Sequence, residues 1–212
     1  MADVFDEVSE DLRRERALKL WKKFAPLIAA AAVSIVLATA GYVLWQDHVR
    51  KRNEAQALRF FEAATIAASD VERAKTELRA LARDASGGYG VLARLKEAAL
   101  AATGDGAEAA KLYRAIAADT ALDAQLRDAA TVLAALLTVD TAEPAESMRA
   151  VQGLKTPTGA WRHAAGEIEA LAHLRAGDRA RAAALYRQLA DDLAAPAGLR
   201  QRASEMLAAL EN

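Results

Sequence analysis

Few residues of this sequence have the types and spacing that catalysis or metal binding requires. The imidazoles are His48, His163 and His173. If the last two share one helix, they lie roughly 15 Å apart along its axis, too far for a shared metal ion. The adjacent carboxylates of Asp191 and Asp192 diverge by about 100° on a helix and normally face solvent. We therefore interpret each histidine as a surface or partly buried side chain and expect no metal site.

Sequence motifs of the common catalytic classes are missing. The chain has no phosphate-binding loop, no G-x-S-x-G and no H-E-x-x-H. It has no Cys, which excludes disulfide scaffolds, thiolate metal sites and Cys nucleophiles. These absences predict a protein that is not an enzyme and that uses no cofactor and no small-molecule substrate.

Four side chains have types and positions that could serve a protein partner. Arg114 and Arg187 occur at matching places in two similar segments and could hold a partner's carboxylate from a groove. The alternative, which we favour, is an exposed arginine whose stem shields apolar surface. Tyr89 and Trp161 each follow a predicted loop and could lie at a groove edge, although core packing is the preferred interpretation of both.

The composition predicts an all-helical protein without a nucleic-acid partner. Ala supplies 56 of the 212 residues and is the best helix former, whereas the residues that strands prefer are sparse. The formal net charge is −1. Residues 1–23 hold six Lys/Arg and six Asp/Glu, and residues 47–212 hold 22 and 23. A nucleic-acid-binding domain would carry a basic patch, so this balance argues against one.

Residues 24–46 are predicted to form a transmembrane helix. These 23 positions contain no charge, and as a helix they extend roughly 34 Å, enough for a hydrocarbon core about 30 Å thick. Aromatic rings and cations typically flank such a span at the level of the lipid headgroups. The membrane-interface residues that we expect are Trp21, Lys22 and Lys23 at one end, and Tyr42 and Trp45 at the other.

The distribution of Lys and Arg sets the orientation of a span. Six basic residues precede the apolar segment and four follow it within a comparable window. The N-terminus is therefore expected in the cytoplasm of a bacterium, with residues 47–212 in the periplasm beyond the inner membrane. A cleaved signal peptide is the rival interpretation, because Ala38-Thr39-Ala40 has the form of a signal-peptidase site. The apolar stretch continues through Trp45, which favours an uncleaved anchor.

The segment 1–23 is predicted to be a charged helix on the cytoplasmic side. Phe5, Val8 and Leu12 follow one another at helical spacing with charges between them. We prefer a solvated helix that leads into the span. The alternative is an interfacial helix that touches anionic lipid through its basic residues.

An internal repeat occurs with an offset of 73 residues. The 34 residues that begin at Gly104 and those that begin at Gly177 align without a gap and share 17 identical positions. The matches include Gly-Asp and Leu-Tyr-Arg, which the abundance of Ala does not explain. The offset is close to twice the 34-residue period of tetratricopeptide repeats, so each unit is expected to contain two helical hairpins.

Each copy predicts a helix, a Gly-Asp turn, a second helix, a short loop and a third helix. The glycine suits a helix end, where φ is often positive, and the aspartate can cap the next helix. Small Ala lets the hairpin partner approach closely, and a Leu-Tyr pair fills the groove beside it. The residues expected to pack in this way are Gly104, Ala109, Leu112 and Tyr113 in the first copy, and Gly177, Ala182, Leu185 and Tyr186 in the second.

Apolar spacing and the positions of Gly and Pro place the other elements. We predict a helical linker over 47–85, with the membrane helix continuing to residue 68 and a second helix over 70–84, followed by a loop at 86–88. A tetratricopeptide-like solenoid of helical hairpins is predicted over 86–212, with units that start near residues 90 and 160. Its further helices are expected at 90–104, 122–139, 144–152, 160–177 and 197–210.

The order of these features resembles the ancillary subunit family of the bacterial SecYEG translocon. The resemblance covers nearly the whole chain and rests on Gly41-Tyr42 and Trp45 at the end of the span, on Tyr89-Gly90-Val91-Leu92-Ala93-Arg94-Leu95, and on Gly166-Glu167 and Gly177-Asp178. Proteins of that family are inner-membrane proteins with one N-terminal span and a periplasmic tetratricopeptide-like domain.

The resemblance implies a non-catalytic protein that associates with translocon subunits and with a membrane-anchored periplasmic chaperone of the peptidyl-prolyl isomerase class. The expected function is a periplasmic scaffold, anchored beside the translocon, that mediates protein–protein contacts and recruits the chaperone to emerging substrates. The alternative is a generic tetratricopeptide adaptor in cell-envelope assembly or division, with the same architecture and different partners.

Overall fold

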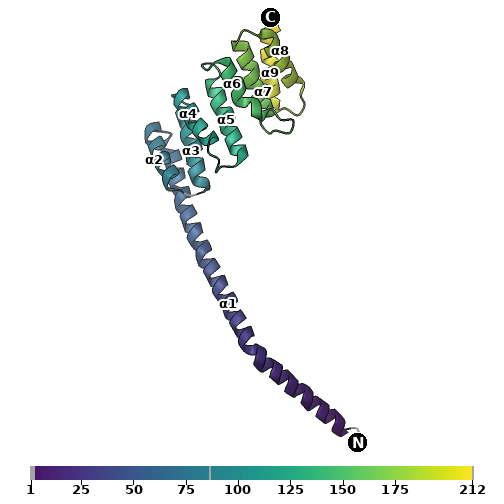
Figure 1. Cartoon of the computed structure of the whole chain (residues 1–212). Helices are drawn as coiled ribbons and strands as arrows, with labels where there is room; N and C mark the ends of the chain where they lie inside the picture. Colours follow the sequence, from purple (N-terminus) through teal and green to yellow (C-terminus); the bar gives the residue numbers. More distant parts are fainter. Residues whose placement is uncertain (1–2, 86, 212) are drawn as a thin grey trace. The chain divides into compact units, whose positions relative to one another are not determined.

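The computed structural model describes residues 3–85 and 87–211 (Figure 1). Side chains are described for residues 18, 19, 21–27, 29–85 and 87–210. Residues 1, 2, 86 and 212 belong to the predicted segments 1–23 and 86–212 but lie outside the described residues, as do the side chains of Phe5, Val8 and Leu12. The described part consists of helices, turns and loops without a strand, which confirms the predicted all-α class.

The first helix, α1 (Asp3–Ile66), contains the long apolar segment. The chain divides into two compact units, residues up to 55 and residues from 56 onward, so that α1 contributes to both. Pro26 lies inside α1, where its ring and its missing N–H favour a bend. Figure 1 shows α1 bent in its N-terminal part. Large apolar side chains of this unit, among them Val36 and Leu44, are exposed.

The second unit is a series of helices that follows the end of α1. They are α2 (Val71–Asp84), α3 (Gly88–Ala101), α4 (Gly106–Ala117), α5 (Ala124–Thr138), α6 (Pro144–Val151), the 3-10 turn η1 (Gln152–Leu154), α7 (Arg162–Arg175), α8 (Arg179–Asp191) and α9 (Ala197–Glu211). The helices predicted over 70–84, 122–139 and 197–210 are observed with ends displaced by at most two residues. From α2 to α9, each α-helix packs on the next one along the chain.

Aspartate side chains begin four of these helices. The carboxylates of Asp70, Asp105, Asp123 and Asp178 accept hydrogen bonds from backbone N–H groups in the first turns of α2, α4, α5 and α8. Those N–H groups have no partner inside their own helix, so each cap stabilises its helix by about 1 kcal/mol. The predicted caps at Asp105 and Asp178 are thereby confirmed.

The core of the second unit is a succession of four small clusters in chain order. Their largest buried residues are Leu78 and Leu81 in the first, Tyr113 and Ile116 in the second, Val151 and Ile168 in the third, and Tyr186 and Leu189 in the fourth. Neighbouring clusters share helices: α5 contributes Ala130 to the second cluster and Val132 to the third. A chain of local cores is typical of a helical solenoid.

The two Gly-Asp turns of the repeat are not equivalent. Gly177 has a φ of +81°, the left-handed conformation that commonly follows a helix end. Gly104 has no positive φ. Its N–H and the N–H of Asp105 both donate to the carbonyl oxygen of Ala101, at 3.1 and 2.8 Å, so that α3 ends without a left-handed residue. The expectation of a positive φ is therefore wrong for Gly104.

Candidate functional site

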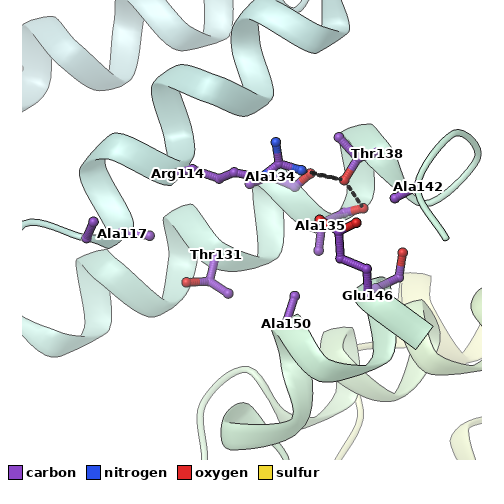
Figure 2. A pocket seen from close by; sticks show the side chains of 11 residues that line it. Arg114, Ala117, Thr131, Ala134, Ala135, Thr138, Ala142, Glu146 and Ala150 are labelled. Atoms are coloured by element: carbon purple, nitrogen blue, oxygen red, sulfur yellow. Dashed lines mark hydrogen bonds between the residues drawn. The ribbon is translucent and has the colours of Figure 1, made fainter. Parts of the chain in front are cut away.

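A groove between α4, α5 and α6 is the candidate functional site (Figure 2). Its volume is about 320 Å³. The residues that line it are Arg114 and Ala117 from α4 with Ala118 directly after it, Thr131, Ala134, Ala135 and Thr138 from α5, and Ala142, Glu146, Ser147 and Ala150 from the following loop and α6. Helices that are consecutive in the chain thus leave a hollow where they meet.

Alanine methyl groups make the apolar part of the groove. Ala134 and Ala135 are buried in two different core clusters, whereas Ala150 on α6 is exposed. Leu or Ile at these positions would fill the space between the helices, because protein interiors pack densely. The short side chains leave a surface suited to an extended segment with small apolar side chains.

Charges of opposite sign lie on two walls of the groove. The guanidinium Nη2 of Arg114 lies 3.5 Å from Oγ1 of Thr138, and Figure 2 shows the side chain reaching from α4 toward α5. Glu146 projects from α6 and is exposed. Neither charge has an ion pair with any residue that the structure describes. A ligand could therefore place a carboxylate against Arg114 and a hydrogen-bond donor against Glu146.

The hydroxyl groups of the groove differ in their hydrogen bonding. Thr131 and Thr138 each donate to a backbone carbonyl of their own helix at 2.9 Å. Thr138 also accepts from Arg114, whereas the hydroxyl of Thr131 can accept from a ligand. Ser147 is 3% exposed, and its Oγ has no hydrogen-bond partner among the described residues. An unpaired buried hydroxyl costs about 1–3 kcal/mol. A ligand that supplies the missing partner would recover part of that cost.

The loop between α5 and α6 is held in place by Arg175 from α7. Its Nη1 donates to the carbonyl oxygens of Val139 and Ala142, at 2.8 and 2.5 Å. Carbonyls at the end of a helix have no partner inside it, so this side chain satisfies groups that would otherwise depend on water. Ala142 lines the groove. Arg175 therefore positions one wall of the groove from outside it.

Of the four residues considered as a possible partner surface, only Arg114 lines the groove. Tyr89 is half-buried, with its ring centroid 6.3 Å from that of Phe60. Trp161 is half-buried against the core cluster of α5, α6 and α7. Arg187 is exposed on α8. Tyr89 and Trp161 thus contribute to packing within the domain.

The residues expected to pack in the repeat explain how Arg114 reaches the groove. Ala109, Ala182, Tyr113 and Tyr186 are buried, Leu112 and Leu185 are half-buried against the core, and Gly104 and Gly177 are exposed at their turns. Because successive helical residues diverge by about 100°, a buried Tyr113 turns the next side chain, Arg114, away from its core cluster. The packing of α4 therefore sets the direction of its arginine.

Several residues of the groove were not identified from the sequence. Thr131, Thr138, Glu146 and Ser147 belong to no motif, and the 34-residue repeat does not single them out. The only relevant signal was Pro144, which predicted the start of α6. Within the described residues, no group of three or more His, Asp or Glu side chains is arranged to hold a metal ion.

The residues expected at a membrane interface all lie on α1. Trp21, Lys22, Lys23, Tyr42 and Trp45 are exposed, and the rings of the last two lie 6.1 Å apart. Among the described residues, one helical stretch, Trp21–Ile66, contains a window that is long and apolar enough to cross a membrane, and none of that window is buried. A signal sequence near an N-terminus meets the same criteria of length and composition.

The comparison with known protein families matches residues 19–211 to the tetratricopeptide repeat-like domain. This match covers most of the chain, including the groove and α1 from residue 19 onward. The chain belongs to the tetratricopeptide repeat-like family. No curated protein and no solved structure matches it. Tetratricopeptide repeat-like domains are helical scaffolds for protein–protein interaction, and their stacked hairpins offer extended surfaces to protein ligands.

Proposed function

We propose that this protein is a membrane-anchored periplasmic scaffold that works at the Sec translocon and links it to periplasmic chaperones. The observation that carries the proposal is the alanine-lined groove of a tetratricopeptide repeat-like domain, where neither Arg114 nor Glu146 forms an ion pair with a described residue. The location rests on the exposed apolar window of α1 and on the resemblance to the translocon's ancillary subunit family.

The groove fits an extended segment of a protein partner. Its alanine surface accepts small apolar side chains, while Arg114 offers a charged fork to a carboxylate. Glu146 accepts from a backbone N–H or from a basic side chain of the same segment. An acidic side chain and a donor on either side of small apolar residues are therefore the features that the partner segment should have.

The membrane anchor fixes where the scaffold acts. Six basic residues before the apolar segment and four after it favour an N-terminus in the cytoplasm and a repeat domain in the periplasm. Protease added outside spheroplasts should digest the repeat domain of the full chain and leave a protected N-terminal fragment. Cleavage after Ala40 would instead give a mature chain that begins at Gly41, which the intact mass of membrane-extracted protein would reveal.

Affinity purification of the full chain in mild detergent tests the partners. Translocon subunits and a membrane-anchored chaperone should be enriched. Division or envelope-assembly proteins in their place would support a generic adaptor and overturn the assignment to the translocon. Recovery of no protein at all would overturn the scaffold itself.

Variants of the groove test where partners bind. R114A should lower partner recovery by about tenfold, because a charge-assisted hydrogen bond is lost. R187A, at the matching position of the second repeat copy, should leave recovery unchanged. A150W should obstruct the groove from an exposed position, while A99W on α3, also exposed, serves as its control. Equal recovery with A150W and A99W would place the binding surface elsewhere on the domain.

A further inference from the structure

A second hollow lies where α1 ends and α2 begins, and it is separate from the groove of α4, α5 and α6. It is lined by Leu58, Phe61, Glu62, Thr65 and Ile66 from α1, with Ser69 and Arg73 beyond, and has a volume of about 640 Å³. All of these residues belong to the second compact unit. The hollow is therefore a feature of the repeat domain itself.

The apolar residues of this hollow take no part in the domain's own core. Leu58 is 61% exposed and Phe61 is 64% exposed. The opposite side of α1 carries the packing: Ala63 is buried and Phe60 packs against the cluster of α2 and α3. Single exposed apolar residues are ordinary, but two large ones on successive turns beside a hollow indicate a surface that another molecule covers.

The hollow carries two charges of opposite sign that form no ion pair within the described part of the domain. Glu62 and Arg73 form no side-chain ion pair with any described residue. Nearby charges do: Arg59 pairs with Asp84 at 3.1 Å. One surface thus combines two exposed apolar side chains, an unpaired anion and an unpaired cation. Such a surface is complementary to a copy of itself.

We propose that this hollow is the contact between two copies of the chain. In a two-fold dimer the same patch meets itself, so Leu58 and Phe61 of one copy cover those of the other. Glu62 of each copy pairs with Arg73 of the other, and the contact contains two such pairs. The occupant is a second copy because a surface carrying both charges satisfies both of them by pairing with itself.

Disulfide crosslinking tests the contact directly, because the chain has no Cys of its own. Thr65→Cys places one thiol in the hollow, and Thr120→Cys places one on an exposed turn elsewhere. The full chain in mild detergent should give a covalent dimer on oxidation for T65C and not for T120C. Equal crosslinking of the two, or none, overturns the proposal. A T65C thiol that stays uncrosslinked yet is shielded from a maleimide in native membranes would assign the hollow to a different protein.

Charge reversal tests the pairing in the T65C background. E62R and R73E each place like charges opposite one another in a dimer and should lower crosslinking by about tenfold. An equimolar mixture of the E62R and R73E chains should restore it, because every cross-pair in the mixed dimer is again opposite in sign. Both positions are exposed, so each variant should keep the helical circular dichroism spectrum of the parent chain, and this measurement checks that misfolding is not the cause. Failure of the mixture to recover crosslinking overturns the assigned pairs.

Discussion

Asp119 and Asp192 stand at the same position of the two repeat copies, and each carboxylate joins its loop to an earlier helix. Asp119, after α4, contacts α3, and Asp192, after α8, contacts α7. Oδ2 of Asp119 accepts from Nη1 of Arg94 at 2.6 Å, whereas Oδ2 of Asp192 lies 2.8 Å from Nε2 of His163. In both copies Oδ1 accepts from a backbone N–H two residues later. Both copies thus contain the aspartate and the local turn, whereas the distant residue that contacts the carboxylate differs between them.

These two aspartates should make the protein less stable in acid. The hydrogen bond from Arg94 holds the pKa of Asp119 below its ordinary value of 3.8, and the N–H of Ala194, followed by His163, does the same for Asp192. A lowered pKa stabilises the fold above pH 3.8, and this contribution is lost as the pH falls below that value. Urea unfolding of the full chain should show a loss of stability below about pH 4.

The acid effect can be assigned by substitution. D119N combined with D192N should lower stability at pH 7 and weaken its dependence on pH below about pH 4. D191N changes a neighbouring exposed carboxylate and serves as the control. An unaltered acid profile in the double variant would show that other carboxylates govern acid unfolding.

The glycines at matching positions of the repeat should respond differently to alanine. G177A should cost about 1–2 kcal/mol, because a Cβ is strained at a φ of +81°. G104A should be neutral or stabilising by up to about 1 kcal/mol, because Gly104 has no positive φ and a Cβ there meets nothing within 4 Å. Free energies of unfolding from denaturant titration compare the two. Equal losses would show that both turns need a left-handed residue.

The buried hydroxyl of Tyr186 should be dispensable for stability. Tyr186 is 1% exposed, and its Oη has no hydrogen-bond partner among the described residues. Burial raises the pKa of Tyr186 to about 12, with the charge of Glu167 adding to the shift. Y186F should therefore be neutral or stabilising by about 1 kcal/mol, while Y186A should cost about 3–5 kcal/mol through the cavity it leaves. A clear loss in Y186F would reveal a partner that the hydroxyl requires.

The ion pair between α2 and α4 should contribute less to stability at high pH. Nζ of Lys75 donates to Glu108 at 2.8 Å and to the exposed Glu72 at 3.1 Å. The hydrogen bond to Glu108 is the main cause that raises the pKa of Lys75 above its ordinary 10.5. A raised lysine pKa stabilises the fold below pH 10.5, and this contribution is lost as the pH rises above it.

Substitutions distinguish how much each of the two partners of Lys75 contributes to stability. E108Q should cost about 1 kcal/mol and reduce the loss of stability above about pH 10.5, because it removes the charge on the less exposed partner. E72Q should have little effect, since Glu72 is largely exposed. Thermal unfolding between pH 7 and pH 11 distinguishes them. Equal effects of the two would contradict a leading role for Glu108.

Arg175 should hold the loop between α5 and α6, which forms one wall of the groove, in its conformation. R175M removes both hydrogen bonds to the carbonyls after α5 and should speed amide exchange in residues 140–151 by about tenfold. Because Ala142 lines the groove, partner recovery should fall as well. R181M changes an exposed arginine on α8 and should alter neither. Unchanged exchange in R175M would mean that the loop is held by other contacts.

Short-range interactions explain why the helices could be predicted from the sequence. A carboxylate such as that of Asp105 caps α4 through N–H groups two and three residues away, and the Ala109 and Tyr113 spacing places both on one buried face. These relations lie within one or two helical turns. The all-helical class and most helix positions followed from them.

The groove could not be predicted in this way, because its walls are distant in the chain. Arg114 and Glu146 lie 32 positions apart on different helices, and only the packing of α4, α5 and α6 brings them to one hollow. For Leu58 and Phe61 the limit is a different one: their spacing indicates an apolar face, but it does not show whether the core covers that face. Periodicity describes one helix at a time, whereas a groove depends on how helices meet.

Identical residues in the two repeat copies also separate what the sequence determines from what the tertiary structure determines. The alignment makes Asp119 equivalent to Asp192 and Gly104 equivalent to Gly177. The fold gives each aspartate a different long-range partner and only Gly177 a positive φ. The residue types fixed the helices and turns through contacts within a few positions, while the tertiary structure decided which backbone conformation and which distant neighbour each copy received.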